Sequence, residues 1–485
     1  MSEFKRQHPV AAISRLIDLI RQNLVTIIIL LFISTTRSNG YFWYFLIGGI
    51  LIALVAGVFG WWMFKYRVHK DELQISKGIF VKNKLYLSKD RIQVIDVTEG
   101  ILQRVFGLVQ VEIKTAGSGT ETATISAITR EEAEELRNEL RKKTAGDDQE
   151  EVVAGMEPEV REEEVEAFWE LSNKDLVLAA FTSGNFGLIA SILGAISGQL
   201  DQFINEETIE YIYEMAPGYS NVTVIISLIL VIFILSWLLS FTGVILKYSH
   251  FKLEKTAKEL VISSGLLERK HITIPFDRIQ AVRFVEGIIR QPFGFGILYV
   301  ESAGFDQSQK ERSIVLVPFL SSDKVSGFLK QFLSEFNEPE YHIKPPLKSL
   351  FRYLRKPNYL LLIAIPVSWY LWDFGWAVAL LIPVFAFIGW MQYKDAALAL
   401  GDHILRMRYR VLSRTTALVK KNRVQNVELD ANPFQRRKQI QSLRVVAASG
   451  AGGIGFEIPD LTEEDCFTAY QWVVGENEDP VILEE

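Results

Sequence analysis

The chain has 485 residues, a formal net charge of −6 and a mean hydropathy of +0.16, with 23% charged residues. Its length allows about three domains of ~150 residues each, and its composition is too apolar for an ordinary water-soluble chain and too charged for an all-membrane bundle, so we expect one part in lipid and one in water. The single cysteine, Cys466, excludes an intramolecular disulfide framework and is consistent with domains in a reducing cytoplasm.

Six apolar runs occur in three pairs, at 24–34 with 41–64, 177–200 with 222–246, and 359–372 with 376–391. Runs of about 20 residues match a hydrocarbon core of roughly 30 Å. The first and fifth runs are shorter and could be buried or re-entrant segments, but each precedes another apolar run by one tight polar turn. No A-x-A-like cleavage site follows the first run, which favours a retained membrane segment over a signal peptide. The pattern predicts six transmembrane helices as three hairpins, at 1–64, 177–246 and 359–391.

Lysine and arginine residues flank the outer ends of these hairpins rather than their turns. Those that flank the first, second and fifth runs are Arg15, Arg21, Lys65, Arg67, Lys70, Lys348, Arg352, Arg355 and Lys356. Because positive residues stay on the cytoplasmic side, the predicted protein is multi-pass in the bacterial cytoplasmic membrane, with both termini and all large polar segments in the cytoplasm.

The polar segments 65–143, 247–335 and 392–475 are copies of one another. The stretches "DRIQV", "DRIQA" and "NRVQN" align on Arg91, Arg278 and Arg423, and the alignment keeps one register over about 45 residues. Alternating apolar positions predict strands, and each copy closes with a helical segment, from Thr129, Ser321 and Thr462. Between the copies we expect an acidic linker at 144–176 and a basic connector at 336–358, and an acidic tail follows at 476–485.

The repeated unit resembles the bacterial pleckstrin-homology (PH) membrane proteins, especially the type with three copies. The resemblance depends on a hairpin followed by "L-x-I-x-x-G", "D-R-I-Q" and "F-G". It implies a curved antiparallel barrel or sandwich with a C-terminal helix, a shorter single-domain relative as partner, and a hypothetical role in envelope stress or in tolerance to membrane-active peptides. The third copy departs from the pattern, because it has Lys438 and Gln439 in place of "F-G" and Tyr409 and Arg410 in place of "K-G".

Catalytic and cofactor motifs are not found in the sequence. The six histidines have no partner at metal-ligand spacing, and "GAGGIGF" at 450–456 is interpreted as a turn between strands rather than as a phosphate loop. We therefore expect a non-enzymatic protein without metal or cofactor that presents its domains as an interaction platform. A six-span transporter of an apolar substrate is the alternative, since the predicted spans contain no Asp, Glu, Lys, Arg or His.

Two sets of residues are candidates for binding. The first is the repeated motif, interpreted as structural rather than anion-binding: Arg91, Gln93, Arg278, Gln280, Arg423 and Gln425. The second is the basic part of the third copy: Arg406, Arg408, Arg410, Lys420, Lys421, Arg436, Arg437 and Lys438. Such a cluster is attracted to anionic lipids by roughly 1 kcal/mol per residue. An acidic protein partner or a solvated face are equally open interpretations, whereas nucleic acid is not expected. The acidic run 147–170 could contact this cluster, but a solvated linker is favoured.

Overall fold

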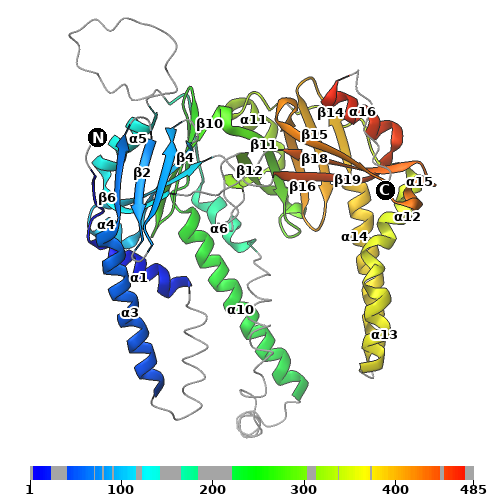
Figure 1. Cartoon of the computed structure of the whole chain (residues 1–485). Coiled ribbons are helices and arrows are strands. Elements are labelled where there is room, and N and C mark those ends of the chain that lie inside the picture. Colours follow the sequence, from blue (N-terminus) through cyan, green and yellow to red (C-terminus); the bar gives the residue numbers. More distant parts are fainter. Residues whose placement is uncertain are drawn as a thin grey trace, which may run out of the picture.

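The computed structural model describes residues 4–22, 41–69, 72–78, 81–89, 92–115, 123–141, 165–183, 221–302, 313–336, 338–371, 374–447 and 453–475. Three β-rich domains lie in a row, and long helices extend from one side of that row (Figure 1). The C-terminal helices of the domains lie on the opposite side. Within the first domain, sheet β1–β2–β3 and strands β4, β5 and β6 enclose a core with α5, so each repeat is a small sandwich capped by a helix.

The three domains use equivalent elements. The first has β1 (Lys65–His69), β2 (Glu72–Lys77), β3 (Asn83–Ser88), β4 (Ile92–Glu99), α4 (Ile101–Val105), β5 (Leu108–Thr115), β6 (Ala123–Thr129) and α5 (Arg130–Arg141). The second has β8 (Lys252–Lys255), β9 (Glu259–Ser264), β10 (Arg269–Pro275), β11 (Ile279–Glu286), η3 (Gln291–Phe293), β12 (Phe295–Ser302), β13 (Ile314–Ser321) and α11 (Val325–Phe332). The third has β14 (Ala397–Leu400), β15 (Ile404–Arg410), β16 (Arg414–Lys420), β17 (Val424–Asp430), α15 (Pro433–Arg436), β18 (Ile440–Ala447), β19 (Ile454–Thr462) and α16 (Glu463–Val474).

Local sequence explains these elements. In β1 the side chains alternate between the core and the surface, with Tyr66 and Val68 buried. At the start of α5 the Thr129 hydroxyl accepts the Glu132 amide at 3.2 Å, and the Thr129 amide donates to the Glu132 carboxylate at 3.3 Å. This is the expected capping box. The Thr462 hydroxyl likewise accepts the Asp465 amide at 3.1 Å at the start of α16.

Sheets continue from one domain into the next. Strand β4 of the first domain pairs antiparallel with β10 of the second, and β11 of the second pairs antiparallel with β16 of the third. Both junctions have the same register, because Glu99 lies opposite Arg269 in one and Glu286 lies opposite Arg414 in the other. Each junction therefore joins the fourth strand of one copy to the third strand of the next.

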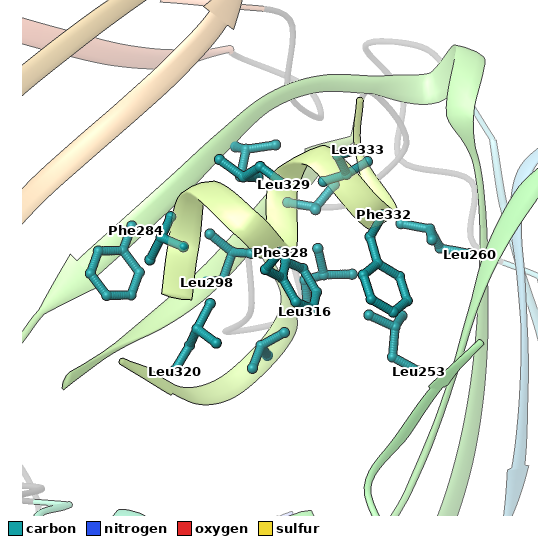
Figure 2. Packing of buried hydrophobic residues seen from close by; sticks show 14 of the residues in the cluster. Leu253, Leu260, Phe284, Leu298, Leu316, Leu320, Phe328, Leu329, Phe332 and Leu333 are labelled. Carbon is teal, nitrogen blue, oxygen red and sulfur yellow. The ribbon is translucent and has the colours of Figure 1, made fainter. Parts of the chain in front are cut away.

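The second domain has the largest apolar core, and this core extends to Ile404 and Leu418 of the third domain. Figure 2 shows Phe328 and Phe332 of α11 among leucines of the surrounding strands, and the two rings stack with centroids 4.6 Å apart. Burial of each such side chain contributes about 1.5–3 kcal/mol. The row is therefore stabilised by shared packing as well as by strand pairing.

The segment before each hairpin also belongs to the domain that follows. Lys5 bridges Tyr66, β7 (Ala167–Glu170) pairs with β8, and Ile343 bridges Leu398 at the equivalent place. A helix comes next in each case: α1 (Val10–Gln22), α6 (Asn173–Phe181) or α12 (Leu347–Arg355). Apolar side chains in the described parts of the expected linker 144–176 and connector 336–358 pack into the domains. The Trp169 ring, for example, lies 6.0 Å from Phe251 and 6.3 Å from Phe328, centroid to centroid.

The helices that extend from the row are α3 (Tyr41–Met63), α10 (Asn221–Tyr248), α13 (Leu361–Leu371) and α14 (Leu381–Asp395). In the part of the chain that the structure describes, one helix, Gly375–Asp395, is long and apolar enough to cross a membrane by length and composition. The predicted run 24–34 and residues 184–200 of the third run lie outside the described residues. The tail 476–485 and residues 448–452 lie outside them too.

The turn after the fourth strand has a left-handed residue at the same position in all three domains. Gly107 and Gly294 have φ of 66° and 69°, and Gln439 has φ of 51° at the equivalent place. All three values lie in the left-handed region, which glycine adopts at the least cost. The third copy, which departs from "F-G", therefore keeps the left-handed residue of this turn.

Candidate functional site

The first domain has a basic pocket on the outer face of sheet β1–β2–β3, next to the end of α3. Its volume is about 490 Å³. The described residues that line it are Phe4, Arg6, Trp62, Met63, Lys65, Arg67, Gln74, Ile75, Ser76, Lys82, Lys84 and Tyr86. Five of these are lysine or arginine, and none of the residues in this lining set is acidic.

Strand pairing produces this arrangement. Lys65 lies opposite Ser76, and Ser76 lies opposite Lys84, so that the three form one row across the sheet. Arg67, Gln74 and Tyr86 form the next row in the same way. Because alternate residues of a strand point to the same face, both rows face outward, whereas Tyr66 and its neighbours across the sheet fill the core.

Arg67, one of the residues that line the pocket, is held in place by two contacts. Its Nε donates to Oε1 of Gln74 at 2.8 Å, and its guanidinium lies 4.2 Å from the centroid of the Phe4 ring. A guanidinium fixed in this way presents its remaining N–H donors in the geometry that suits a phosphate or carboxylate. Trp62 and Met63, the last residues of α3, line one side of the pocket. The pocket can therefore bind an anionic group at the level where α3 ends.

Arg406, Arg408 and Arg410 share strand β15, but they contact protein groups. Arg406 donates to the Pro339 carbonyl at 3.1 Å and lies 3.3 Å from the Glu338 carboxylate. Arg408 donates to the Asp395 carbonyl at 2.7 Å. Both guanidiniums lie over the Tyr341 ring, at 4.2 and 4.5 Å from its centroid. Arg410 is buried and pairs with the Asp395 carboxylate at 2.5 Å. Arg406 and Arg408 therefore hold the segment before the third hairpin against β15, and Arg410 holds the end of α14.

The other basic residues of the third domain are more dispersed. Lys420 pairs with Glu335, and Lys421 lies 5.2 Å from the Trp472 ring centroid. The remaining three, Arg436, Arg437 and Lys438, are exposed on and after α15. The predicted cluster is thus divided between residues with partners inside the protein and an exposed basic group at one end of the row. Anion binding by this exposed group stays a prediction.

The repeated Arg and Gln have structural contacts where they are described. Arg278 pairs with Asp277 at 3.4 Å, and Gln280 is buried and donates to the Arg278 carbonyl at 3.0 Å. Arg423 reaches across the second junction and donates to the Asp277 carbonyl at 2.6 Å. Its neighbour Gln425 is exposed on β17. Arg91 lies outside the described residues, as does the side chain of Gln93.

No motif in the sequence predicts the basic pocket. Lys65 and Arg67 entered only as markers of membrane orientation, and Lys82 and Lys84 were not singled out. A signal was present in the spacing. Lys65 with Arg67, and Lys82 with Lys84, are basic pairs at i and i+2 in or directly before strands of one three-stranded sheet, and alternate residues of a strand share a face. Among the described residues, no group of three or more His, Cys, Asp or Glu could hold a metal ion.

Three sandwich domains of one design, each preceded by its own helical segment and joined through their sheets, define a membrane-associated array of PH-like domains. The bacterial PH domain family model matches residues 18–144, 192–335 and 358–475, and the chain belongs to this family. It is 32% identical to the UPF0699 transmembrane protein YdbT of Bacillus subtilis (strain 168), over 99% of this chain and 100% of that protein. It is also 30% identical to the shorter UPF0699 transmembrane protein YdbS of the same organism, over 20% of this chain and 58% of that protein.

Proposed function

We propose that this protein is a non-enzymatic scaffold of the bacterial cytoplasmic membrane that assembles with a shorter PH-domain relative. Six spans in three hairpins would anchor it, with both termini and the three domains in the cytoplasm. One observation carries the proposal: two junctions in this chain join PH-like domains by the same strand pairing in the same register. Domains of this design therefore have a common way of binding one another. The existence of a shorter homologue supplies a partner of the required kind.

The two ends of the row differ in how well they could pair with the sheet of a further domain. Among the described strands, β3 pairs only with β2, and β17 pairs only with β18. By the repeat register, Lys82 at the β3 end corresponds to Arg269 and Arg414, whereas Ala431 at the β17 end takes the place of Glu99 and Glu286. The first domain therefore keeps the cation of the junction, and the third domain lacks the acid. The partner is expected to pair its fourth strand with β3 and to place a carboxylate beside Lys82.

Co-purification of the intact protein with its host's shorter relative, in mild detergent, tests this proposal. The variant Lys82→Glu should reduce the recovered relative at least about tenfold, or ~1.4 kcal/mol, because two carboxylates would then meet at the junction. Lys77→Glu is the matched control, since Lys77 is exposed on the central strand β2 and makes the same change of charge away from the edge. Absence of the relative from the wild-type preparation would refute the scaffold proposal. Equal recovery with both variants would refute only the use of β3.

The basic pocket supports a second candidate function, the binding of an anionic phospholipid headgroup by the first domain. The observation that supports this function is the group of five cations beside the end of α3. Lys65→Gln with Arg67→Gln should lower the amount of anionic lipid that stays with the purified protein, as measured by lipid mass spectrometry. Arg437→Gln with Lys438→Gln removes the same charge from the exposed group of the third domain and is the control. A loss confined to that control would assign lipid binding to the third domain instead.

The expected role in envelope defence is part of the same proposal. A strain that lacks the protein should be more sensitive to membrane-active peptides than its parent, and restoring the wild-type chain should reverse the effect. Unchanged sensitivity in the deletion strain would rule out that role and would leave the scaffold proposal as it stands.

A further inference from the structure

Two loops of every domain expose large apolar side chains. In the turn between the second and third strands these are Val81 in the first domain, Leu266 and Leu267 in the second, and Val411 and Leu412 in the third. After the fourth strand they are Ile101, Val105 and Phe106, then Ile288, Ile289 and Phe293, then Phe434. Phe293, Phe434 and Val105 are 68%, 65% and 75% exposed. A recurrent apolar loop in three domains with otherwise different surfaces is unusual for a surface in contact with water.

The loops after the fourth strand are tied to the helices that lead into the hairpins. In the first domain the buried side chain of Gln103 donates to the Ser14 hydroxyl of α1 at 3.2 Å. In the second, the buried guanidinium of Arg290 occupies the equivalent position and donates to the Ala179 carbonyl of α6 at 2.8 Å. In the third, Gln435 contacts Asp460 at 2.7 Å, and Asp460 pairs with Arg352 of α12 at 2.9 Å.

In the second and third domains, the turns between the second and third strands lie beside α10 and α14, the helices that lead from the hairpins into these domains. The Leu266 amide donates to the Leu246 carbonyl of α10 at 2.9 Å, and Gln392 of α14 donates to the Val411 carbonyl at 3.0 Å. Both kinds of loop therefore lie on the side of the row from which the long helices extend (Figure 1).

The apolar loops also meet at the domain junctions. Arg104 of α4 donates to the Leu266 carbonyl at 3.2 Å, which joins the first domain's loop to the second domain's turn. Arg410 next to Val411 donates to the side chain of Gln291 in η3, which joins the second domain's loop to the third domain's turn. The loops consequently meet in pairs at both junctions, and together their exposed side chains make up what we call the apolar ridge, along the helix side of the row.

We infer that this apolar ridge is embedded in the membrane leaflet that faces the domains, so that the row lies flat on the bilayer along its whole length. The occupant is lipid because the ridge is continuous with the ends of helices that enter the membrane. Exposed cations flank it at Arg104, Arg436, Arg437 and Lys438, and an apolar strip bordered by basic residues is the pattern of interfacial membrane segments. The inference depends on attachment to a membrane and not on the partner or ligand proposed above.

Site-directed spin labelling of the full chain in phospholipid nanodiscs tests the inference. Single cysteines at Val105, Phe293 and Phe434 place one nitroxide in each domain, and the exposure of these side chains means that little packing is lost. Native Cys466 is fully buried and stays in place. The control label is at Val474, which is 40% exposed on α16, on the opposite side of the row (Figure 1).

Power saturation with oxygen and with a water-soluble nickel chelate then reports whether each nitroxide lies in lipid or in water. All three loop labels should be relaxed more strongly by oxygen than by nickel, and the Val474 label should show the reverse order. Loop labels that resemble the Val474 label would overturn the inference and would leave the ridge as a surface for a protein absent from the nanodisc. A Phe293 label in water, with only the terminal labels in lipid, would overturn it as well, because the ridge would then not be embedded along its length.

Discussion

Replacement of Glu286 by glutamine should weaken the junction between the second and third domains. Arg414 Nε donates to Glu286 Oε2 at 2.6 Å, and a second hydrogen bond joins Arg414 Nη2 to the other carboxylate oxygen. The Glu286 side chain is 3% exposed and that of Arg414 is 26% exposed. These hydrogen bonds raise the pKa of the Arg414 guanidinium, because the Glu286 carboxylate stabilises its charged form.

The magnitude follows from this geometry. Removing one partner of a buried ion pair costs about 3–5 kcal/mol, and the lower end applies because Arg414 is partly hydrated and keeps Asp395 at 3.8 Å. A loss of about 3 kcal/mol corresponds to a roughly 100-fold larger opening constant. Hydrogen exchange of the β11 and β16 amides, in detergent, should become faster by about that factor.

A matched control is available in the third domain. Glu428 on β17 pairs with Arg444 at 3.5 Å, with both side chains well exposed, and such pairs contribute about 0–1 kcal/mol. Glu428→Gln should therefore change exchange of the β17 and β18 amides by less than about fivefold. An equally small effect of Glu286→Gln on β11 and β16 would refute the conclusion that this ion pair holds the junction together.

Three further outcomes are expected. Burial lowers the pKa of His271, which lies on β10 at the first junction. The unfolded chain binds the proton more readily than the folded chain, so thermal stability should fall as pH drops below about 6.5. His271→Gln should flatten that pH dependence in a series of melting experiments. Burial raises the pKa of the Cys466 thiol to about 12, so mass spectrometry should find no alkylation by iodoacetamide at pH 7.5 until the chain is unfolded. In Gly389→Ala the new Cβ would lie 2.1 Å from the Tyr353 carbonyl oxygen. The substitution would therefore push α14 away from α12 and should lower the free energy of unfolding by about 1–3 kcal/mol in a denaturation experiment. Gly243→Ala is the control, because its Cβ would meet open space, and it should not destabilise.

Much of each domain was predictable because its signals are local. Alternating burial in β1 follows alternating side-chain polarity, and Thr129 and Thr462 begin helices because a hydroxyl can accept a free backbone amide. The three-copy register followed from residues that every copy needs for the same turns. The segment before each hairpin was harder to predict. Trp169, for example, lies next to a run of carboxylates that is typical of a solvated linker, and the strand to which it belongs has only four residues.

The junctions and the pocket depend on contacts between distant residues. No local pattern tells which edge of one sandwich meets the next, although Glu99 and Glu286 recur at one repeat position and Arg269 and Arg414 recur at another. The charge of Arg406 and Arg408 suggested a binding or solvated surface. Arg406, however, pairs with Glu338 of the expected connector, and Arg408 donates to the Asp395 carbonyl at the end of α14. Charge density along the sequence does not tell how much of that charge is already neutralised in the fold.

The shared sheets make the order of biosynthesis important. Strand β4 is complete when Glu99 is made, but its partner β10 begins about 170 residues later, which is a delay of roughly 10–30 s at ~5–20 residues per second. During that time the growing chain has an unpaired strand edge, which is a template for aggregation. A shorter interval, of about 130 residues, separates the end of β11 from the start of β16. Each newly made domain therefore protects the one before it, and a ribosome that stalls between two repeats would release a chain whose last finished sandwich is unprotected.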